Sequence, residues 1–319
     1  MCSAPAYART ANEYYPDGKL KIEWIEKSCK EQRQKRVYYQ SGRLQAEFNY
    51  RYNMLEGLSK IYHKNGNIMA EGFFKKGRLE AIAREYYVCG ALKEEAFFKN
   101  GKREGITRMF FKHGIVGAEW HYANNKLNGT SRVYNDMGIL TEEIEFKDGV
   151  RNGITRSYFT NGCVLSKQNY KNDKPDGLFK EFFFSGAVMS EALYCNGKLD
   201  GISRAYYENG TVYEETVYKN GKLDGVYSAY HKNGLLGSHL YFKNDDPDGI
   251  HKAWYSNGKP AFIDVYTNGR KITAISFDHH GMLQQDQDVQ FTADDYTPYP
   301  GDDLISLTGR SIKERTGSN

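Results

Sequence analysis

The sequence predicts an all-β protein: an elongated, twisted ribbon or solenoid of antiparallel β-hairpins, built from about eleven 24-residue repeats. Three observations predict this fold class. Glycine recurs at a fixed spacing, Asn-Gly pairs recur between the glycines, and aromatic residues keep constant places in each repeat. The composition agrees, because 32 Gly, 26 Tyr and 17 Phe suit many short strands joined by tight turns.

Each repeat opens on a glycine, and we number its positions 1–24 from there. Gly201 opens one repeat and Gly225 the next, and a second glycine follows at position 10. Position 6 is aromatic throughout, position 18 is aromatic from the second repeat on, and position 2 is almost always aliphatic. The opening glycines are Gly57, Gly105, Gly129, Gly153, Gly177, Gly201, Gly225 and Gly249, with Ala81 as the one replacement.

Every repeat is expected to form strand, turn, strand, turn. Asn-Gly at positions 9 and 10 predicts a two-residue hairpin turn, because both residues accept a positive φ. The second turn is Lys-Asn-Gly-Lys or a variant of it. A two-residue first turn places position 4 opposite position 15, and position 1 opposite the ring at position 18. Charges support this register, since position 4 is basic and position 15 acidic; Arg156 opposite Lys167 departs from the rule.

The repeats divide the chain into four parts. Residues 1–8 are an N-terminal extension, and residues 9–272 are the repeat array. Residues 273–283 are a degenerate capping repeat. Residues 284–319 form a tail that is acidic first and basic last, and we expect it to be flexible. Stacked hairpins should extend the array to a length on the order of 100 Å.

The repeat resembles a known family. The run from Tyr218 to Gly225, an aromatic residue followed by Lys-Asn-Gly-Lys-Leu-Asp-Gly, is similar to the core of MORN repeats. The fuller unit, which adds Tyr206-Tyr-x-Asn-Gly210, resembles the variant MORN repeat of the YwqK-type antitoxins. The resemblance covers residues 9–272. It implies a β-hairpin array and a role in protein binding, scaffolding or lipid association, and the antitoxin group implies neutralisation of a partner toxin.

Two features of the repeat are candidates for partner binding. The aromatic residues at position 7 lie on the opposite face from position 6, where they are either exposed as a stripe or buried in the ribbon. The lysines of the second turn, at positions 19 and 22, form a basic edge that acidic residues at position 24 partly cancel. Solvated turn lysines are the alternative interpretation. The candidates are Tyr87, Phe111, Phe159, Phe183, Tyr207, Tyr255, Lys75, Lys99, Lys102, Lys147, Lys171, Lys198, Lys219, Lys222 and Lys243.

The sequence favours a protein without catalytic activity. Its acidic residues recur with the repeat, whereas a catalytic pair would appear once, and no metal-ligand spacing or phosphate-binding loop is present. We therefore expect no catalytic residue, cofactor, metal or small-molecule substrate. The net charge of +4 does not indicate nucleic acid binding. Five cysteines out of register with the repeat, and no signal-like or membrane-spanning segment, predict a cytoplasmic protein.

Three functional hypotheses follow. The first is a protein-binding repeat scaffold, which includes an antitoxin or immunity protein that masks a partner. The second is a membrane-peripheral scaffold that binds anionic lipids through the basic turn edge. The third is a structural or virion component, since the end strands of such a sheet are open to edge-to-edge self-association.

Overall fold

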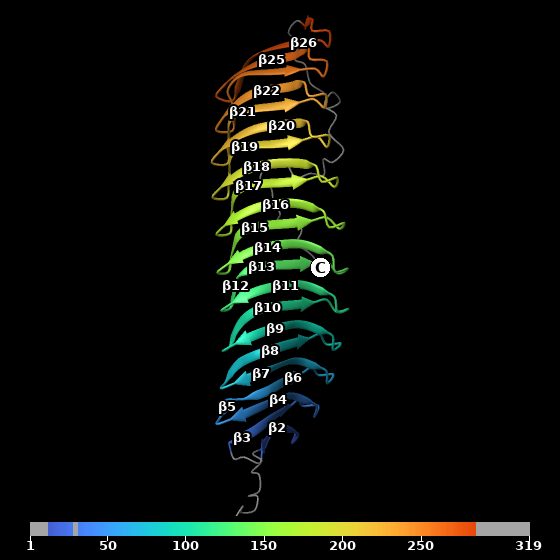
Figure 1. The fold of residues 1–319 in the computed structure, drawn as a ribbon, viewed down its shortest axis with the longest axis vertical. Helices are drawn as coiled ribbons and strands as arrows, with labels where there is room; N and C mark the ends of the chain where they lie inside the picture. The colour runs from blue at the N-terminus through green and yellow to red at the C-terminus, as the bar shows by residue number, and fades with distance from the viewer. Residues whose placement is uncertain (1–11, 28–30, 285–319) are drawn as a thin grey trace, which may run out of the picture.

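The computed structural model describes residues 12–27 and 31–284, which form one continuous antiparallel sheet of 27 strands (Figure 1). Long strands pair with their neighbours along the chain, as β19 (Lys198–Tyr206) pairs with β20 (Val212–Lys219) and β20 with β21 (Lys222–Tyr230). The sheet is a meander that climbs along one axis as a narrow twisted ribbon. The predicted fold class is confirmed.

The strands follow the 24-residue period. They are β1 (Glu13–Tyr14), β2 (Leu20–Glu26), β3 (Gln32–Tyr38), β4 (Leu44–Arg51), β5 (Met54–Leu55), β6 (Gly57–Tyr62), β7 (Ile68–Lys75), β8 (Arg78–Tyr86), β9 (Leu92–Lys99), β10 (Lys102–Phe110), β11 (Val116–Ala123), β12 (Lys126–Leu127), β13 (Gly129–Tyr134), β14 (Leu140–Lys147), β15 (Val150–Tyr158), β16 (Val164–Lys171), β17 (Lys174–Phe182), β18 (Val188–Cys195), β19, β20, β21, β22 (Leu236–Lys243), β23 (Asp246–Pro247), β24 (Gly249–Trp254), β25 (Pro260–Thr267), β26 (Arg270–Phe277) and β27 (Leu283–Gln284).

The register inside each hairpin is the one that the charges predict. Gly201 lies opposite Tyr218, and Arg204 lies opposite Glu215. The same pairing of positions 1 with 18 and 4 with 15 recurs in the hairpins on either side. Acidic and basic side chains therefore meet directly across most hairpins, while Arg156 lies opposite Lys167 and Ser228 opposite His239.

The first turn differs from the prediction. Tyr207 N donates to Thr211 O at 2.8 Å, and Gly210 N donates to Tyr207 O at 2.8 Å, which leaves a three-residue loop. In this loop Gly210 has a φ of +85°, whereas Asn209 is not among the residues with positive φ. Such a loop is a type I turn closed by a glycine bulge. Asn209 stabilises this loop through its side chain, because its Oδ1 accepts a hydrogen bond from Thr211 N at 3.0 Å.

A β-bulge explains why the predicted strand register is correct although the predicted geometry of the first turn is wrong. Tyr206 lies opposite Val212, but its neighbour Ala205 lies opposite Glu214, so the register shifts by one residue at Tyr213. This extra residue compensates for the odd length of the loop. The two-residue Asn-Gly turn is instead the second turn, where Asn220 and Gly221 have φ values of +53° and +86° between paired Lys219 and Lys222.

Glycine at position 1 is required by the backbone. The residues that open the repeats have a positive φ, and Gly201 has +117°. The strand register shifts at this point, between Ala192 and Tyr194 on the preceding strand. The ring at position 18 does lie opposite, as predicted, but backbone conformation gives the stronger reason for glycine. Ala81 keeps the same conformation, with a φ of +64°, at a cost that glycine would not have.

Strand alternation divides the ribbon into two faces. We call the face with positions 2, 4, 6, 15 and 17 the front face, and the face with positions 1, 3, 5, 14, 16 and 18 the back face. Most buried side chains lie on the back face and are small, such as Ser131, Thr107 and Ala96. The sheet has no second layer in the described chain, so burial comes from the larger side chains beside them on the same face.

The C-terminal end of the array is a shortened hairpin. β26 pairs with β27, and Gly281 N donates to Asp278 O at 2.8 Å, as in the other first turns. The predicted extension 1–8 and all of the predicted tail 284–319 except Gln284 lie outside the described residues. Within the described chain, the structure has no helix of the length and hydropathy needed to cross a membrane.

Candidate binding surface

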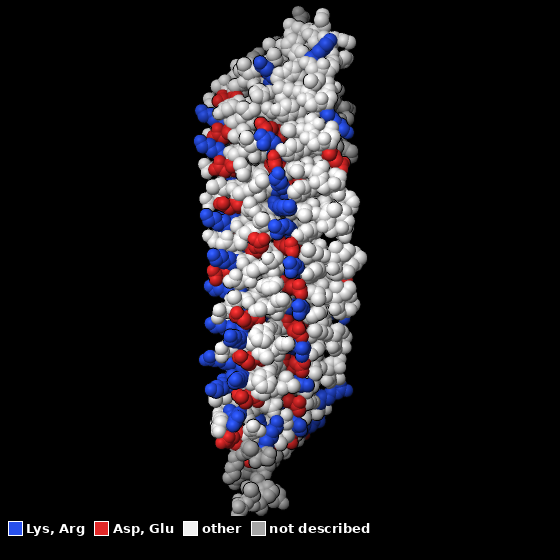
Figure 2. Space-filling view, in the orientation of Figure 1, with Lys and Arg blue, Asp and Glu red and all other residues white. Residues whose placement is uncertain are grey.

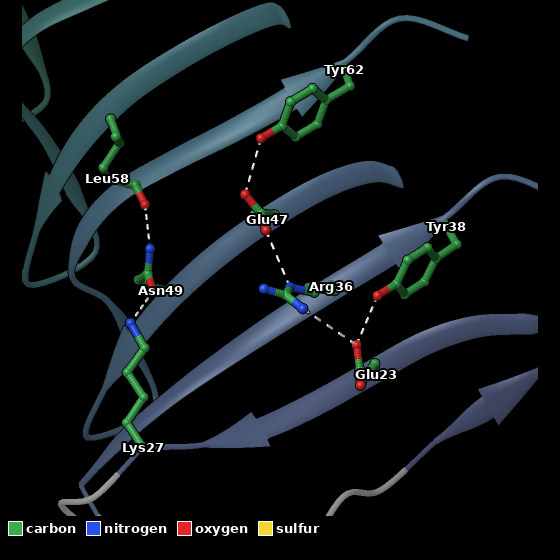
Figure 3. A network of polar contacts seen from close by, with 8 residues as sticks. All are labelled: Glu23, Lys27, Arg36, Tyr38, Glu47, Asn49, Leu58 and Tyr62. Carbon is green, nitrogen blue, oxygen red and sulfur yellow. Dashed lines mark hydrogen bonds and ion pairs between the residues drawn. The ribbon is translucent and has the colours of Figure 1, made fainter. Parts of the chain in front are cut away.

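A ladder of charged and phenolic side chains runs along the front face. In the repeat from Gly201, Arg204 Nε donates to Glu215 Oε2 at 2.6 Å. Tyr206 Oη donates across the repeat boundary to Glu191 Oε1 at 2.7 Å. Figure 3 shows the same contacts near the N-terminus, where the Glu47 carboxylate accepts hydrogen bonds from both Arg36 and Tyr62. The basic column at position 4 thus holds the fold together, as the facing charges predicted.

The ladder shifts the pKa values of its members. Burial, followed by the hydrogen bond to Glu47, raises the pKa of Tyr62 to about 12. The pKa of Tyr206 rises to about 12 for the same reasons, with Glu191 as its partner. The hydrogen bonds from Tyr206 and Lys180 lower the pKa of the Glu191 carboxyl. Glu191 is therefore ionised in the folded protein across the neutral range, and its charge is used within the sheet.

Arg156 and Lys167, the like-charged pair at positions 4 and 15, each contact another side chain. Arg156 Nη1 lies 3.7 Å from Glu145 Oε1. Lys167 Nζ lies over the ring of Phe182, 5.7 Å from its centroid. Phe182 holds position 6, where most repeats have a tyrosine that donates to Glu at position 15. Each residue of the like-charged pair is thus stabilised by a neighbour outside the pair.

The aromatic side chains at position 7 are half-buried between successive repeats. Tyr87 Oη donates to Phe110 O at 2.8 Å, and Tyr207 Oη donates to Tyr230 O at 2.9 Å. Tyr255 makes the same contact to Phe277 O at 2.8 Å. The other members of this column, which have no hydroxyl, are also half-buried: Phe111, Phe159 and Phe183. The tyrosines bridge repeats, and because all six rings are half-buried they do not form an exposed stripe.

The lysines of the second turn lie along one long edge of the ribbon. We call this the Lys edge; it consists of Lys75, Lys99, Lys102, Lys147, Lys171, Lys198, Lys219, Lys222 and Lys243, and all nine side chains are exposed. None of them forms an ion pair with another described residue, although Lys102 Nζ lies 3.5 Å from Asn124 Oδ1. Figure 2 shows this edge on the left, with acidic residues between the basic ones.

The acidic residues between the lysines have a structural task. Glu80 Oε2 accepts from Asn100 N at 2.7 Å, and Glu104 Oε2 accepts from Asn124 N at 2.9 Å. Asp176 makes the equivalent contact to Asn196 N at 3.1 Å. These three carboxylates at position 24 therefore hold the second turn of the next repeat. The lysines around them remain available to a partner.

Between the Lys edge and the ladder lies an apolar surface that the sequence analysis did not single out. It is formed by positions 2 and 17, which face each other across each hairpin, as Ile202 faces Val217. Figure 2 shows this uncharged surface between the two charged columns. The N-terminal patch comprises Leu58, Phe73, Ile82, Phe97 and Ile106, and the C-terminal patch comprises Leu178, Leu193, Ile202, Val217, Val226, Tyr241, Ile250 and Val265.

The two apolar patches are exposed and separated. Side chains of the N-terminal patch are 36% to 44% exposed. In the C-terminal patch the exposed fraction is 37% to 52%, with Val217 and Val265 somewhat more buried. Between the patches the same positions are mostly polar, with Thr130, Glu145 and Asn169, and Ile154 is the one aliphatic residue among them. The regular aliphatic residue at position 2 is the sequence feature that could have indicated this surface. An aliphatic residue in a strand, however, normally indicates burial.

The described residues of the two faces hold no cluster of metal-ligating side chains. Among residues 12–27 and 31–284, no three His, Cys, Asp or Glu side chains lie close enough to hold a metal ion. The three described cysteines, Cys89, Cys163 and Cys195, are exposed free thiols. The back face has a shallow slot of about 200 Å³ in which Ser59 and Gly72 lie beside Phe74. Its carboxylate Glu94 pairs with Arg103 at 2.5 Å.

Comparison with known proteins supports the repeat assignment. The profile of the MORN repeat variant family matches residues 10–25, 55–76, 151–172, 175–196, 199–220 and 247–268. Six segments of the array are thus similar to the MORN repeat variant. These matches lie in phase with the hairpins, each of the longer ones covering one first turn and the two strands that it joins.

Other comparisons add little to this MORN-repeat assignment. One solved structure, titled TcdB2-TccC3-Cdc42, is 10% identical at a TM-score of 0.14 and covers 87% of this chain but 20% of its own. Another, titled TcdB2-TccC3, is 11% identical at a TM-score of 0.15 over 86% and 20%. The chain thus spans about a fifth of these proteins, and so low a TM-score supports no conclusion. No curated protein matches the chain.

Proposed function

We propose that this chain is a non-enzymatic protein-binding scaffold whose partner binds the front face. The observation that carries the proposal is the exposed apolar surface at positions 2 and 17, which runs beside lysines that have no acidic partner in the described chain. Exposed apolar patches with a charged rim are typical of protein interaction sites. MORN repeats are generally associated with protein or membrane binding, which agrees with this role.

The test of this role is capture of the partner. Tagged full-length protein, purified from its source cell under mild conditions, should retain one partner in stoichiometric amount. A front-face variant with Leu58→Thr and Phe73→Thr should retain less of it. Recovery of no partner would contradict the proposal.

A narrower form of the proposal is an antitoxin or immunity protein that masks its partner. It follows from the resemblance of the repeat to the YwqK-type unit. The captured partner should then inhibit growth when expressed alone, and co-expression of this chain should restore growth. A partner that is harmless alone would exclude the antitoxin role and leave the scaffold role intact.

The Lys edge favours a second candidate function, a membrane-peripheral scaffold that binds anionic lipid. Nine exposed lysines along one edge would attract phosphatidylserine headgroups. Flotation with vesicles tests this, because electrostatic binding should rise with phosphatidylserine content and fall with salt. Binding that ignores both would exclude this version.

A further inference from the structure

The C-terminal patch is a straight row of apolar side chains. In four successive hairpins, position 2 lies directly opposite position 17, as Leu178 lies opposite Leu193 and Val226 opposite Tyr241. Neighbouring strands are about 4.8 Å apart, so an apolar side chain recurs about every 4.8 Å along the ribbon. Four repeats make a row of roughly 38 Å.

This spacing discriminates between partner conformations. In a helix with a heptad pattern, apolar residues recur every 3.5 residues on average, or about every 5.2 Å. Side chains on one side of an extended strand recur about every 6.6 Å, which falls out of step with the row within a few residues. A helix of about 25 residues has the length of the patch.

The charges beside the patch are asymmetric. On one side lie Lys198, Lys219, Lys222 and Lys243 of the Lys edge, without ion pairs in the described chain. On the other side lies the ladder, where Lys180 and Arg204 are already neutralised by Glu191 and Glu215 at 3.0 and 2.6 Å. A bound segment would therefore meet a row of unpaired lysines along one flank, whereas at position 4 on the ladder flank of this patch only Lys252 of the described chain, which lies opposite Ile263, lacks an ion pair.

We propose that the C-terminal patch binds an acidic amphipathic helix of a protein partner, laid along the ribbon with its heptad apolar seam on positions 2 and 17. Acidic residues of that helix face the Lys edge, and uncharged polar residues face the ladder. This inference rests on the proposed scaffold function and specifies its partner.

A lipid surface fits the patch less well. The apolar side chains are only 37% to 52% exposed, so they do not project as a membrane-inserting element would. The carboxylates of position 24, including Asp200 and Asp224, lie in the same edge as the lysines and would face anionic headgroups. A helix can avoid them by the placement of its own charges.

The test uses the full-length chain and a synthetic 28-residue peptide with Leu at heptad positions a and d and Glu along one flank. Its controls are a peptide of the same composition with the leucines moved off the seam, and a 14-residue version. We expect the seam peptide to bind at least about tenfold more tightly than either control. Equal binding of the seam and scrambled peptides would overturn the proposal.

Variants locate the site. Leu193→Thr with Ile202→Thr should weaken peptide binding about tenfold, because threonine keeps strand preference while removing apolar surface. The matched control is Met137→Thr with Leu235→Thr, on the first-turn edge, where the side chains are 67% and 45% exposed. Circular dichroism should show that both double variants fold. Unchanged binding by the first variant would refute this site.

Two outcomes separate this inference from the proposed function. If a native partner is captured and still binds the Leu193→Thr, Ile202→Thr variant fully, the scaffold role stands and the helix site is wrong. If the chain binds phosphatidylserine vesicles through the same residues and does not bind the seam peptide, the partner class is wrong. Lys198→Gln with Lys219→Gln and Lys222→Gln should also reduce the salt dependence of peptide binding.

Discussion

At the scale of single residues, position 15 of each repeat controls the ladder. In most repeats where it is glutamate, it pairs with the guanidinium or ammonium at position 4 and accepts a hydrogen bond from a tyrosine hydroxyl of the next repeat, as Glu191 does. Where it is Lys167 or His239, the next position 6 is Phe182 or Trp254, neither of which has a hydroxyl to donate to a carboxylate. In these two repeats the side chain at position 6 therefore matches the residue at position 15 that it meets, whereas Phe110 beside Glu95 does not follow this rule.

Lys167 is the point at which this ladder can be improved. It lies opposite Arg156 on one strand and opposite Lys180 on the other, so both of its neighbours carry the same charge. Lys167→Glu should raise the free energy of unfolding by about 0.5 kcal/mol, measured by urea denaturation. Lys232→Glu, at an exposed turn position, is the control. An equal gain in both variants would contradict the cross-strand explanation.

The pKa of Glu214, on the back face, is shifted in the opposite direction to that of Glu191. Burial raises the pKa of its carboxyl, although hydrogen bonds from Thr216 and Tyr227 oppose the shift. A raised pKa means that this group favours folding at low pH and that this contribution is lost as pH rises through the folded-state value. Glu214→Gln should therefore raise the melting temperature at pH 7, and the gain should shrink as pH falls toward 4.

Glu191→Gln supplies the control of opposite sign. The lowered pKa of Glu191 means that its ionised carboxylate stabilises the fold at pH values above its unfolded-state pKa of about 4.5. This stabilisation is lost as the pH falls through the folded-state pKa. The variant should melt at a lower temperature at pH 7, with a difference that shrinks in acid. A pH-independent difference in either variant would show that packing, and not ionisation, causes it.

At the scale of the hairpin, two turns of different geometry give each repeat its shape. The three-residue first turn needs a bulge on the following strand, and the second turn is followed by the irregular step at position 1. Both devices increase local twist. Each depends on backbone at positive φ, which glycine supplies at positions 1, 10 and 21.

Ala81 is the clearest place to test this dependence. Its φ of +64° is unfavourable for a residue with a Cβ atom, by about 1 kcal/mol. Ala81→Gly should therefore raise the free energy of unfolding by about that amount, less a small loss from the more flexible unfolded chain. Gly201→Ala should do the reverse, because its φ is +117° and the new Cβ would lie 3.2 Å from Leu193. Destabilisation by Ala81→Gly would contradict the argument.

At the scale of the whole molecule, the array is one-dimensional. Each strand contacts only the next strand on either side, so its stability is approximately a sum over repeats and their interfaces. The long axis carries the functional pattern as well: the apolar patches occupy separate groups of repeats, with polar residues such as Glu145 between them.

A deletion tests this modularity. Removal of residues 153–176 takes out one complete repeat and joins two strands in their normal alternation, so the shortened chain should fold cooperatively. Its length, measured by small-angle X-ray scattering, should fall by about 10 Å. Removal of residues 153–164 alone should be far more damaging, because it deletes a first turn and places a second turn where a first turn belongs. Similar stability of the two deletions would contradict the repeat as the unit of folding.

Much of the fold of this protein can be predicted from the 24-residue period alone. Opposite charges at positions 4 and 15 predict the register, and the structure places Arg204 opposite Glu215. The geometry of the turns could not be predicted in the same way. Asn-Gly at positions 9–10 and at positions 20–21 look alike in sequence, and a compensating bulge at Tyr213 leaves the register unchanged whichever turn is assumed.

The sequence by itself determined the 24-residue hairpin, the stacking of hairpins and the pairing of charges across strands, because these depend on periodicity and on nearest neighbours. Only the tertiary structure decided which apolar positions a partner can reach. Alternation shows which residues share a face of a strand, but exposure depends on the side chains of the adjacent repeats. The rings at position 7 are half-buried by those neighbours, whereas Ile202 and its row remain exposed between two charged columns.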